Sequence, residues 1–140
     1  MRNPALAADH LRRAQARLRA LDVLYEAESW ADVVRESQEV VELALKGLLH
    51  AVGVDPPRVH DVADVLEAER DRLPPELTED VERLAAASRS LRRDRELAFY
   101  GAPDIVPSGF YTEGDATEAR RAAQLTVGRL APLVLDTLHR

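Results

Sequence analysis

An arginine cluster holds the side chains of this 140-residue chain that are best suited to chemistry. Arg89, Arg92, Arg93 and Arg95 lie within seven residues, and Tyr100 follows shortly after. A guanidinium group is planar and matches two phosphate oxygens at once, so the cluster predicts contacts with a nucleotide or an RNA backbone. Arg95 and Tyr100 are the candidate catalytic pair, and a tyrosine here can also stack on a base or simply cap the core.

Arg95 has an informative position in the helical pattern. Leu84, Leu91 and Arg95 fall on one helical stripe, which places a guanidinium on a face expected to be buried. Because a buried arginine is costly unless it is paired, Arg95 is expected to meet an internal carboxylate or to point into a cleft or a subunit interface. The structural alternative is a solvated arginine face that pairs with Asp94 and Glu96.

A second polar cluster follows a four-residue step, with Gln38, Glu42 and Lys46 beside a broad apolar face. At this spacing the three side chains form a nearly straight line along a helix. One interpretation is an ion pair between Glu42 and Lys46 that steadies the helix by a few tenths of a kcal/mol. The other is the edge of a groove where a phosphate or a partner chain binds, with Glu42 and Lys46 among its ligands.

The remaining residue types predict no metal and no cofactor. The chain has no cysteine, its four histidines show no metal-ligand spacing, and its six glycines form no phosphate-binding loop. His60 has the ordinary pKa of about 6.5 that suits a general base, but it also stands where a helix is expected to start. Without a nucleophile nearby in the sequence, the structural role of His60 is favoured.

Composition places the chain among globular proteins. Hydrophobic residues make up 46%, and the formal net charge is −6. An acidic chain is not a natural non-specific ligand of nucleic acid, so any such binding must come from local basic patches. The absence of cysteine, of a secretory signal and of a long apolar run predicts a cytoplasmic protein with no membrane segment. The length predicts one domain over residues 1–140.

The elements that must position these clusters are helices, because alanine, leucine, arginine and glutamate dominate and β-formers are sparse. The first helix is predicted from Asn3-Pro4, and the second from Ser29 to a stop at Gly53. A third is predicted from Asp61, and a fourth ends near Gly101.

Residues 101–114 have the composition of a loop, and a fifth helix is predicted from Thr112 with Asp115 as its capping partner. Pro132 should kink that helix or split off its last turn. The prediction is an all-α, up-and-down antiparallel bundle of four to five helices.

Three stretches in this order resemble the HEPN family (higher eukaryote and prokaryote nucleotide-binding domains). They are the helix that carries Gln38, Glu42 and Lys46, the pair His60-Asp61, and the helix end that runs from Arg95 to Gly101. This helix end, together with the start of the next helix at Phe110-Tyr111-Thr112, looks like that of a prokaryotic stand-alone branch of the family. The resemblance spans about residues 5–135.

The resemblance implies a helical bundle that pairs as a homodimer. Many members of the family accompany a minimal nucleotidyltransferase in a toxin–antitoxin pair, and many are metal-independent ribonucleases. The ribonuclease site is an arginine followed, after four to six residues, by a histidine. Arg95 matches the arginine, but Tyr100 stands where the histidine is expected. A tyrosine with a pKa near 10 is a poor general base at neutral pH, so the nuclease motif is degenerate.

The leading hypothesis is therefore a HEPN-like homodimer that is associated with nucleotide or RNA and works with a nucleotidyltransferase. Its expected ligand-binding residues are Arg92, Arg93, Arg95, Lys46 and Glu42. One alternative is an active metal-independent endoribonuclease toxin, and another is a non-catalytic helical interaction module. A further prediction is that a partner enzyme modifies the hydroxyl group of Tyr100.

Overall fold

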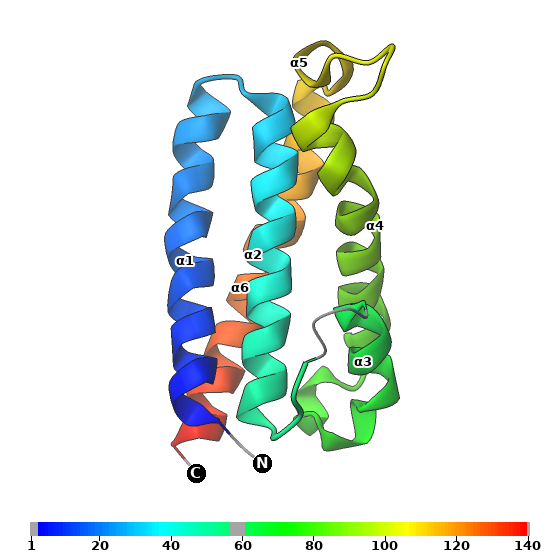
Figure 1. Cartoon of the computed structure of the whole chain (residues 1–140). Coiled ribbons are helices and arrows are strands. Elements are labelled where there is room, and N and C mark those ends of the chain that lie inside the picture. Colours follow the sequence, from blue (N-terminus) through cyan, green and yellow to red (C-terminus); the bar gives the residue numbers. More distant parts are fainter. Residues whose placement is uncertain (1–2, 57–60, 140) are drawn as a thin grey trace.

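The computed structural model describes residues 3–56 and 61–139, without the side chains of residues 95 and 96. Four long helices run alternately up and down (Figure 1). They are α1 (Pro4–Glu26), α2 (Trp30–Ala51), α4 (Val81–Tyr100) and α6 (Glu113–Leu138). This arrangement confirms the predicted all-α antiparallel bundle, and the described residues contain no β-strand.

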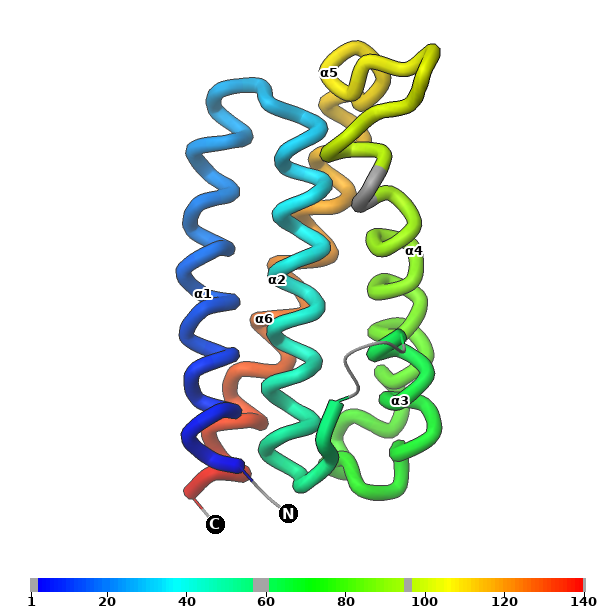
Figure 2. The backbone as a smooth tube through the Cα atoms, in the orientation of Figure 1, coloured from blue at the N-terminus to red at the C-terminus, as the bar shows by residue number. Residues whose placement is uncertain are grey.

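Two short helices lie at opposite ends of the bundle. Helix α3 (Val62–Ala68) lies against α4 near the end of the bundle that holds both termini, and α5 (Pro107–Phe110) lies at the other end (Figure 1). Two turns of 3₁₀ helix, η1 (Arg70–Arg72) and η2 (Pro75–Leu77), connect α3 to α4. The tube in Figure 2 shows the long connection between α2 and α4, and the compact loop that carries α5.

Helix α2 is the centre of the molecule, because it packs against α1, α4 and α6. Its side chains Leu45, Leu48 and Leu49 are completely buried. Full burial of a leucine contributes about 2 kcal/mol before the cost of ordering the chain, so this helix anchors the core. A helix held so firmly positions the polar line along its edge.

The helix ends are set by the residues that the sequence indicates. The side chain of Asn3 accepts a hydrogen bond from the backbone N–H of Leu6 at 3.2 Å. Thr112 and Asp115 form a reciprocal capping box at the start of α6, as predicted. Gly53 and Gly101 follow α2 and α4 with φ of 86° and 74°, a backbone conformation that favours glycine.

One local expectation is wrong, and one of the two alternatives at Pro132 is excluded. The predicted loop of residues 101–114 contains α5, a single helical turn that begins at Pro107, a residue whose fixed φ suits a first helical position. Helix α6 also continues through Pro132 to Leu138 without splitting off its last turn. The side chains of Leu130 and Val134 are completely buried on either side of the proline, and this packing offsets the loss of one backbone donor.

No helix within the described residues is long and apolar enough to cross a bilayer.

Candidate functional site

The polar line on α2 is an interacting set of side chains. The Nε2 atom of Gln38 donates to Glu42 Oε2 at 3.3 Å, and Lys46 Nζ lies 3.8 Å from Glu42 Oε1. Glu42 and Lys46 are only 16% and 28% exposed, and Gln38 is almost completely buried. The ion pair at a four-residue step agrees with the structural interpretation of this line.

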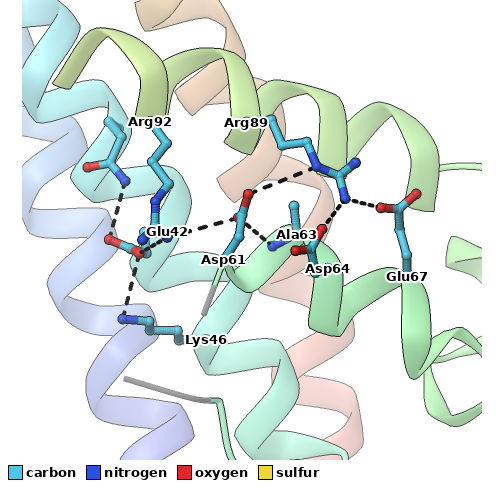
Figure 3. Close-up of polar contacts among 9 residues, drawn as sticks. Glu42, Lys46, Asp61, Ala63, Asp64, Glu67, Arg89 and Arg92 are labelled. Atoms are coloured by element: carbon cyan, nitrogen blue, oxygen red, sulfur yellow. Dashed lines mark hydrogen bonds and ion pairs between the residues drawn. The ribbon is translucent and has the colours of Figure 1, made fainter. Parts of the chain in front are cut away.

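The same carboxylate also reaches the arginine cluster. Arg92 Nη1 of α4 lies 3.7 Å from Glu42 Oε1 and 4.0 Å from Asp61 Oδ1 (Figure 3). The fold therefore brings the two charged clusters together, with Glu42 forming ion pairs with both Lys46 and Arg92. We call Arg89, Arg92 and Arg93 the arginine ridge of α4.

Arg89 forms ion pairs with neighbouring carboxylates. It lies 3.9 Å from Asp61 and 2.5 Å from Asp64, and it also pairs with Glu67 (Figure 3). Hydrogen bonding to Glu67, then to Asp64, raises the pKa of Arg89 above its ordinary value. Arg89 therefore fastens α3 to α4, and its donors are less available to a ligand than those of its neighbours.

The arginine ridge borders a surface pocket. Asp61, Arg89, Arg92 and Arg93 line this pocket, whose volume is about 430 Å³. Arg92 is paired only at 3.7 and 4.0 Å, and Arg93 makes no ion pair or hydrogen bond among the described side chains. An anionic group in the pocket would therefore meet Arg93 directly and would draw Arg92 away from weak contacts.

Asp61 has two roles here that the sequence indicated only in part. It is the predicted N-cap of α3, and its Oδ1 atom accepts from the backbone N–H of Ala63 at 2.9 Å. The same carboxylate faces both Arg89 and Arg92. The ion pairs of Asp61, Asp64 and Glu67 with α4 were missed in the sequence, because no local pattern says which distant helix a solvated carboxylate will meet.

Two of the predicted residues fall outside the description of the structure. The side chain of Arg95 lies outside the described residues, although its backbone belongs to α4, and His60 lies outside them entirely. The stripe that suggested the importance of Arg95 is nevertheless a buried face, because Leu84, Ser88 and Leu91 are all buried.

Tyr100 is the last residue of α4 and its side chain is 77% exposed. It lies eight residues beyond Arg92, which corresponds to roughly 12 Å along a helix. Its ring packs edge-on against Phe99, whose own ring lies beneath the guanidinium of Arg35 at 4.2 Å. Tyr100 is thus accessible at the α5 end of the bundle, apart from the pocket of the arginine ridge.

Tyr111 is a polar residue whose place the sequence did not reveal. It is 5% exposed, and its hydroxyl donates to the backbone and side-chain oxygens of Asp94 at 3.3 Å. Burial, and then the negative charge of Asp94, raise the pKa of Tyr111 to about 12. The only local sign in the sequence that Tyr111 is buried and hydrogen-bonded is its position just before the start of a helix.

Within residues 3–56 and 61–139, no three side chains of metal-binding type gather at one point. Guanidinium groups have the charge and the planar geometry to bind anions, and nearby carboxylates hold those of Arg89 and Arg92 in place.

Comparison with known proteins agrees with this description. The crystal structure of TT1696 from Thermus thermophilus is similar, with a TM-score of 0.69 and 26% sequence identity over 94% of this chain and 97% of that chain. None of the curated proteins compared with the chain matches it. The family model described as "HEPN domain" matches residues 7–128 and supports a nucleotide- or RNA-associated function. The match covers well over half of the sequence, and the chain belongs to the HEPN family.

Proposed function

We propose that this protein is a HEPN-type homodimer that binds nucleotide or RNA phosphate along α4. We further propose that residues 1–140 act as one domain, paired with a minimal nucleotidyltransferase in a toxin–antitoxin system. Membership of the HEPN family supports the association with nucleotide or RNA.

The observation that carries the proposal is the unequal pairing along the arginine ridge. Arg89 is saturated by carboxylates, while Arg92 is weakly paired and Arg93 has no partner among the described side chains. Arg93 is exposed beside two other arginines, so its donors are available in solvent to an anionic ligand. The phosphate of a nucleotide or of an RNA backbone has the matching charge and geometry.

Lys46 and Glu42 are proposed to support this site. Glu42 holds both Lys46 and Arg92 within 4 Å, so it fixes where these cations lie. We assign a positioning role to Glu42, and an electrostatic role to Lys46 at the edge of the site. Arg95, whose side chain lies outside the described residues, is proposed as a further phosphate ligand.

RNA cleavage is not the activity that we favour. The position of the motif histidine is taken by Tyr100, and a phenol is a poorer general base than an imidazole for removing a proton from ribose at neutral pH. The exposed hydroxyl group of Tyr100 is better suited to accept a group from a partner enzyme, and we propose it as the site of such a modification.

Binding tests the proposed site directly. We expect the Arg93→Gln variant to bind labelled single-stranded RNA or ATP at least about fivefold more weakly, with a shallower dependence of affinity on salt. Arg13→Gln is the matched control, because Arg13 is exposed on α1 without a described partner and loses the same charge. Equal weakening by both substitutions would mean that only net charge matters and would reject the site.

Cleavage and pairing are tested separately. Incubation of the wild-type protein with labelled tRNA and mRNA should leave both intact. Cleavage that is lost in Arg95→Ala would instead establish an endoribonuclease. Co-expression with a minimal nucleotidyltransferase, followed by mass spectrometry, should reveal a mass increase on the peptide that contains Tyr100. An unmodified peptide throughout would reject the modification.

A further inference from the structure

A second pocket lies on the other side of α4, away from the arginine ridge. Its volume is about 470 Å³, and it is formed by α4, α6 and the α5 segment over a floor that includes Val34 of α2. Its walls carry small residues, among them Ala87 and Ser90 of α4 and Ala122 of α6. We call it the α4–α6 groove.

The charge of this groove is opposite to that of the ridge. Asp94, Asp115 and Glu118 line it, and no lysine or arginine among the described side chains does so. Asp94 accepts from Tyr111, and Asp115 accepts from Thr112. Glu118 is exposed and has no ion pair or hydrogen bond among the described side chains. The described side chains of the groove thus carry only negative charge, which favours a cationic ligand over a phosphate.

The groove also presents apolar surface. Leu91 and Ala119 are buried in its wall, while the ring of Phe110 is 49% exposed at its edge. Small side chains along α4 and α6 allow another backbone to approach closely, and the exposed ring supplies an apolar contact. Apolar surface beside three carboxylates that form no ion pair among the described side chains matches a ligand that is both apolar and basic.

The secondary structure of the walls limits the kind of partner. Helices α4 and α6 satisfy their backbone donors and acceptors internally, so neither wall offers a strand edge for pairing. A partner segment must then satisfy its own backbone, and a helix does so. We propose that the α4–α6 groove binds a basic amphipathic helix of a partner protein.

In this complex the apolar stripe of the partner helix would enter the groove beside Leu91 and Phe110. Its lysine or arginine side chains would reach Asp94, Asp115 and Glu118. A second copy of this chain fits less well, because the leucines of its own long helices are mostly buried in its core. The inference does not depend on the proposed nucleotide or RNA binding, which concerns the opposite face of α4.

A designed peptide tests the groove by standing in for the natural partner. The probe is a fluorescent helical peptide of about four turns, with leucines on one face and arginines on the other. The control peptide keeps the leucines and replaces every arginine with glutamate. Fluorescence anisotropy should show saturable binding of the basic peptide alone, and wild-type protein that binds both peptides equally or neither would overturn the inference.

Matched variants locate the binding. Glu118→Lys should weaken binding of the basic peptide at least about fivefold, and Ser90→Trp should weaken it by obstructing the wall. Glu79→Lys is the control, because Glu79 is exposed outside the groove and changes the net charge by the same amount. All three substitutions lie at exposed positions, and thermal melting followed by circular dichroism checks that the variants remain folded.

Two outcomes would overturn the inference at this stage. Equal effects of Glu118→Lys and Glu79→Lys would reduce the binding to net charge. Dissociation of a dimer by Glu118→Lys, but not by Glu79→Lys in sedimentation experiments, would show that the groove is instead a contact between two copies of this chain.

Discussion

Arg92 and Arg93 are adjacent in sequence but have different electrostatic surroundings. Arg92 lies within 4 Å of two carboxylates, whereas Arg93 has no partner among the described side chains. Two identical side chains on one helix thus differ in how available they are to a ligand, because the fold places carboxylates beside one of them and not beside the other. The surroundings of Tyr111 and His50 also change their properties, and each residue leads to a test of how stability depends on pH.

Tyr111 should make stability depend on pH in the alkaline range. Its pKa is raised from 10.0 to about 12, so the folded state retains the phenol proton that the unfolded state loses. This contribution is complete below pH 10 and is lost as the pH rises toward 12. Between these values, urea unfolding should show a loss on the order of 2–3 kcal/mol more in the wild type than in Tyr111→Phe. Tyr100→Phe is the control, because its ring is largely exposed and this substitution should leave the alkaline loss unchanged.

His50 should make stability depend on pH in the acidic range. Burial, and then the nearby ring of His10, lower its pKa, while Lys46 also lowers it and Asp55 opposes the change. The two imidazole ring centres lie 5.2 Å apart. The unfolded state then binds a proton more readily, so this contribution is present above about pH 6.5 and is lost as the pH falls toward the lower folded value.

We expect His50→Gln to flatten the decline of the unfolding free energy below neutral pH in urea titrations. His139→Gln changes an exposed histidine and is expected to retain the decline. An identical acidic decline in the wild type and in His50→Gln would contradict the role assigned to His50.

Helix α4 carries the two surfaces of the molecule on different faces. Residues 89, 92 and 93 line the pocket of the ridge, while residues 87, 90 and 94 line the α4–α6 groove. At 3.6 residues per turn, the centres of these two sets lie on different sides of the helix, while Ser90 and Arg93, three residues apart, lie at the border between them. The position of the end of α4 consequently sets the geometry of both surfaces and of Tyr100.

Gly101 should therefore be sensitive to substitution. Its φ is 74°, and a Cβ atom there would lie 2.6 Å from the carbonyl oxygen of Ile105 and 2.9 Å from Pro107 Cδ. We expect Gly101→Ala to reduce the free energy of unfolding by about 1–3 kcal/mol. Gly128→Ala is the matched control within α6, where nothing lies within 4 Å of the added atom. It should stabilise the protein by about 0.5–1 kcal/mol, because alanine favours helix. A comparable loss in both variants would contradict this assignment.

At the scale of the whole molecule, charge separates the two proposed binding surfaces. The chain is acidic overall, with a net charge of −6, yet α4 exposes Arg93, which has no partner among the described side chains. Anionic ligands are attracted only locally, while the acidic groove selects against them. Exposed aromatic and aliphatic residues gather at the α5 end, where Phe99, Tyr100, Val106 and Phe110 are about half exposed or more.

The proposed homodimer predicts a mass in solution of twice 15.6 kDa. Sedimentation equilibrium at several protein concentrations measures this mass directly. Since apolar burial drives most subunit association, the dimer should persist when salt is raised, whereas RNA binding should weaken. A constant mass of 15.6 kDa at every concentration would reject the homodimer.

The sequence by itself determined the helical class, the antiparallel order and most helix ends. These features depend on residues no more than a few positions apart, such as the capping box of Thr112 and Asp115 or the stop at Gly101. The continuous path of α6 through Pro132 was not predictable in this way, because it depends on the tertiary packing of Leu130 and Val134.

Only the tertiary structure decided which charges neutralise one another. Arg89 meets carboxylates 22 and 25 residues away in the chain, and Glu42 of α2 meets Arg92 of α4. Such partners are chosen by how the helices pack, and the energy of an ion pair falls steeply with distance and with exposure to water. A list of arginines in a sequence therefore predicts a basic surface, but the packed helices determine which of those arginines remains free for a ligand.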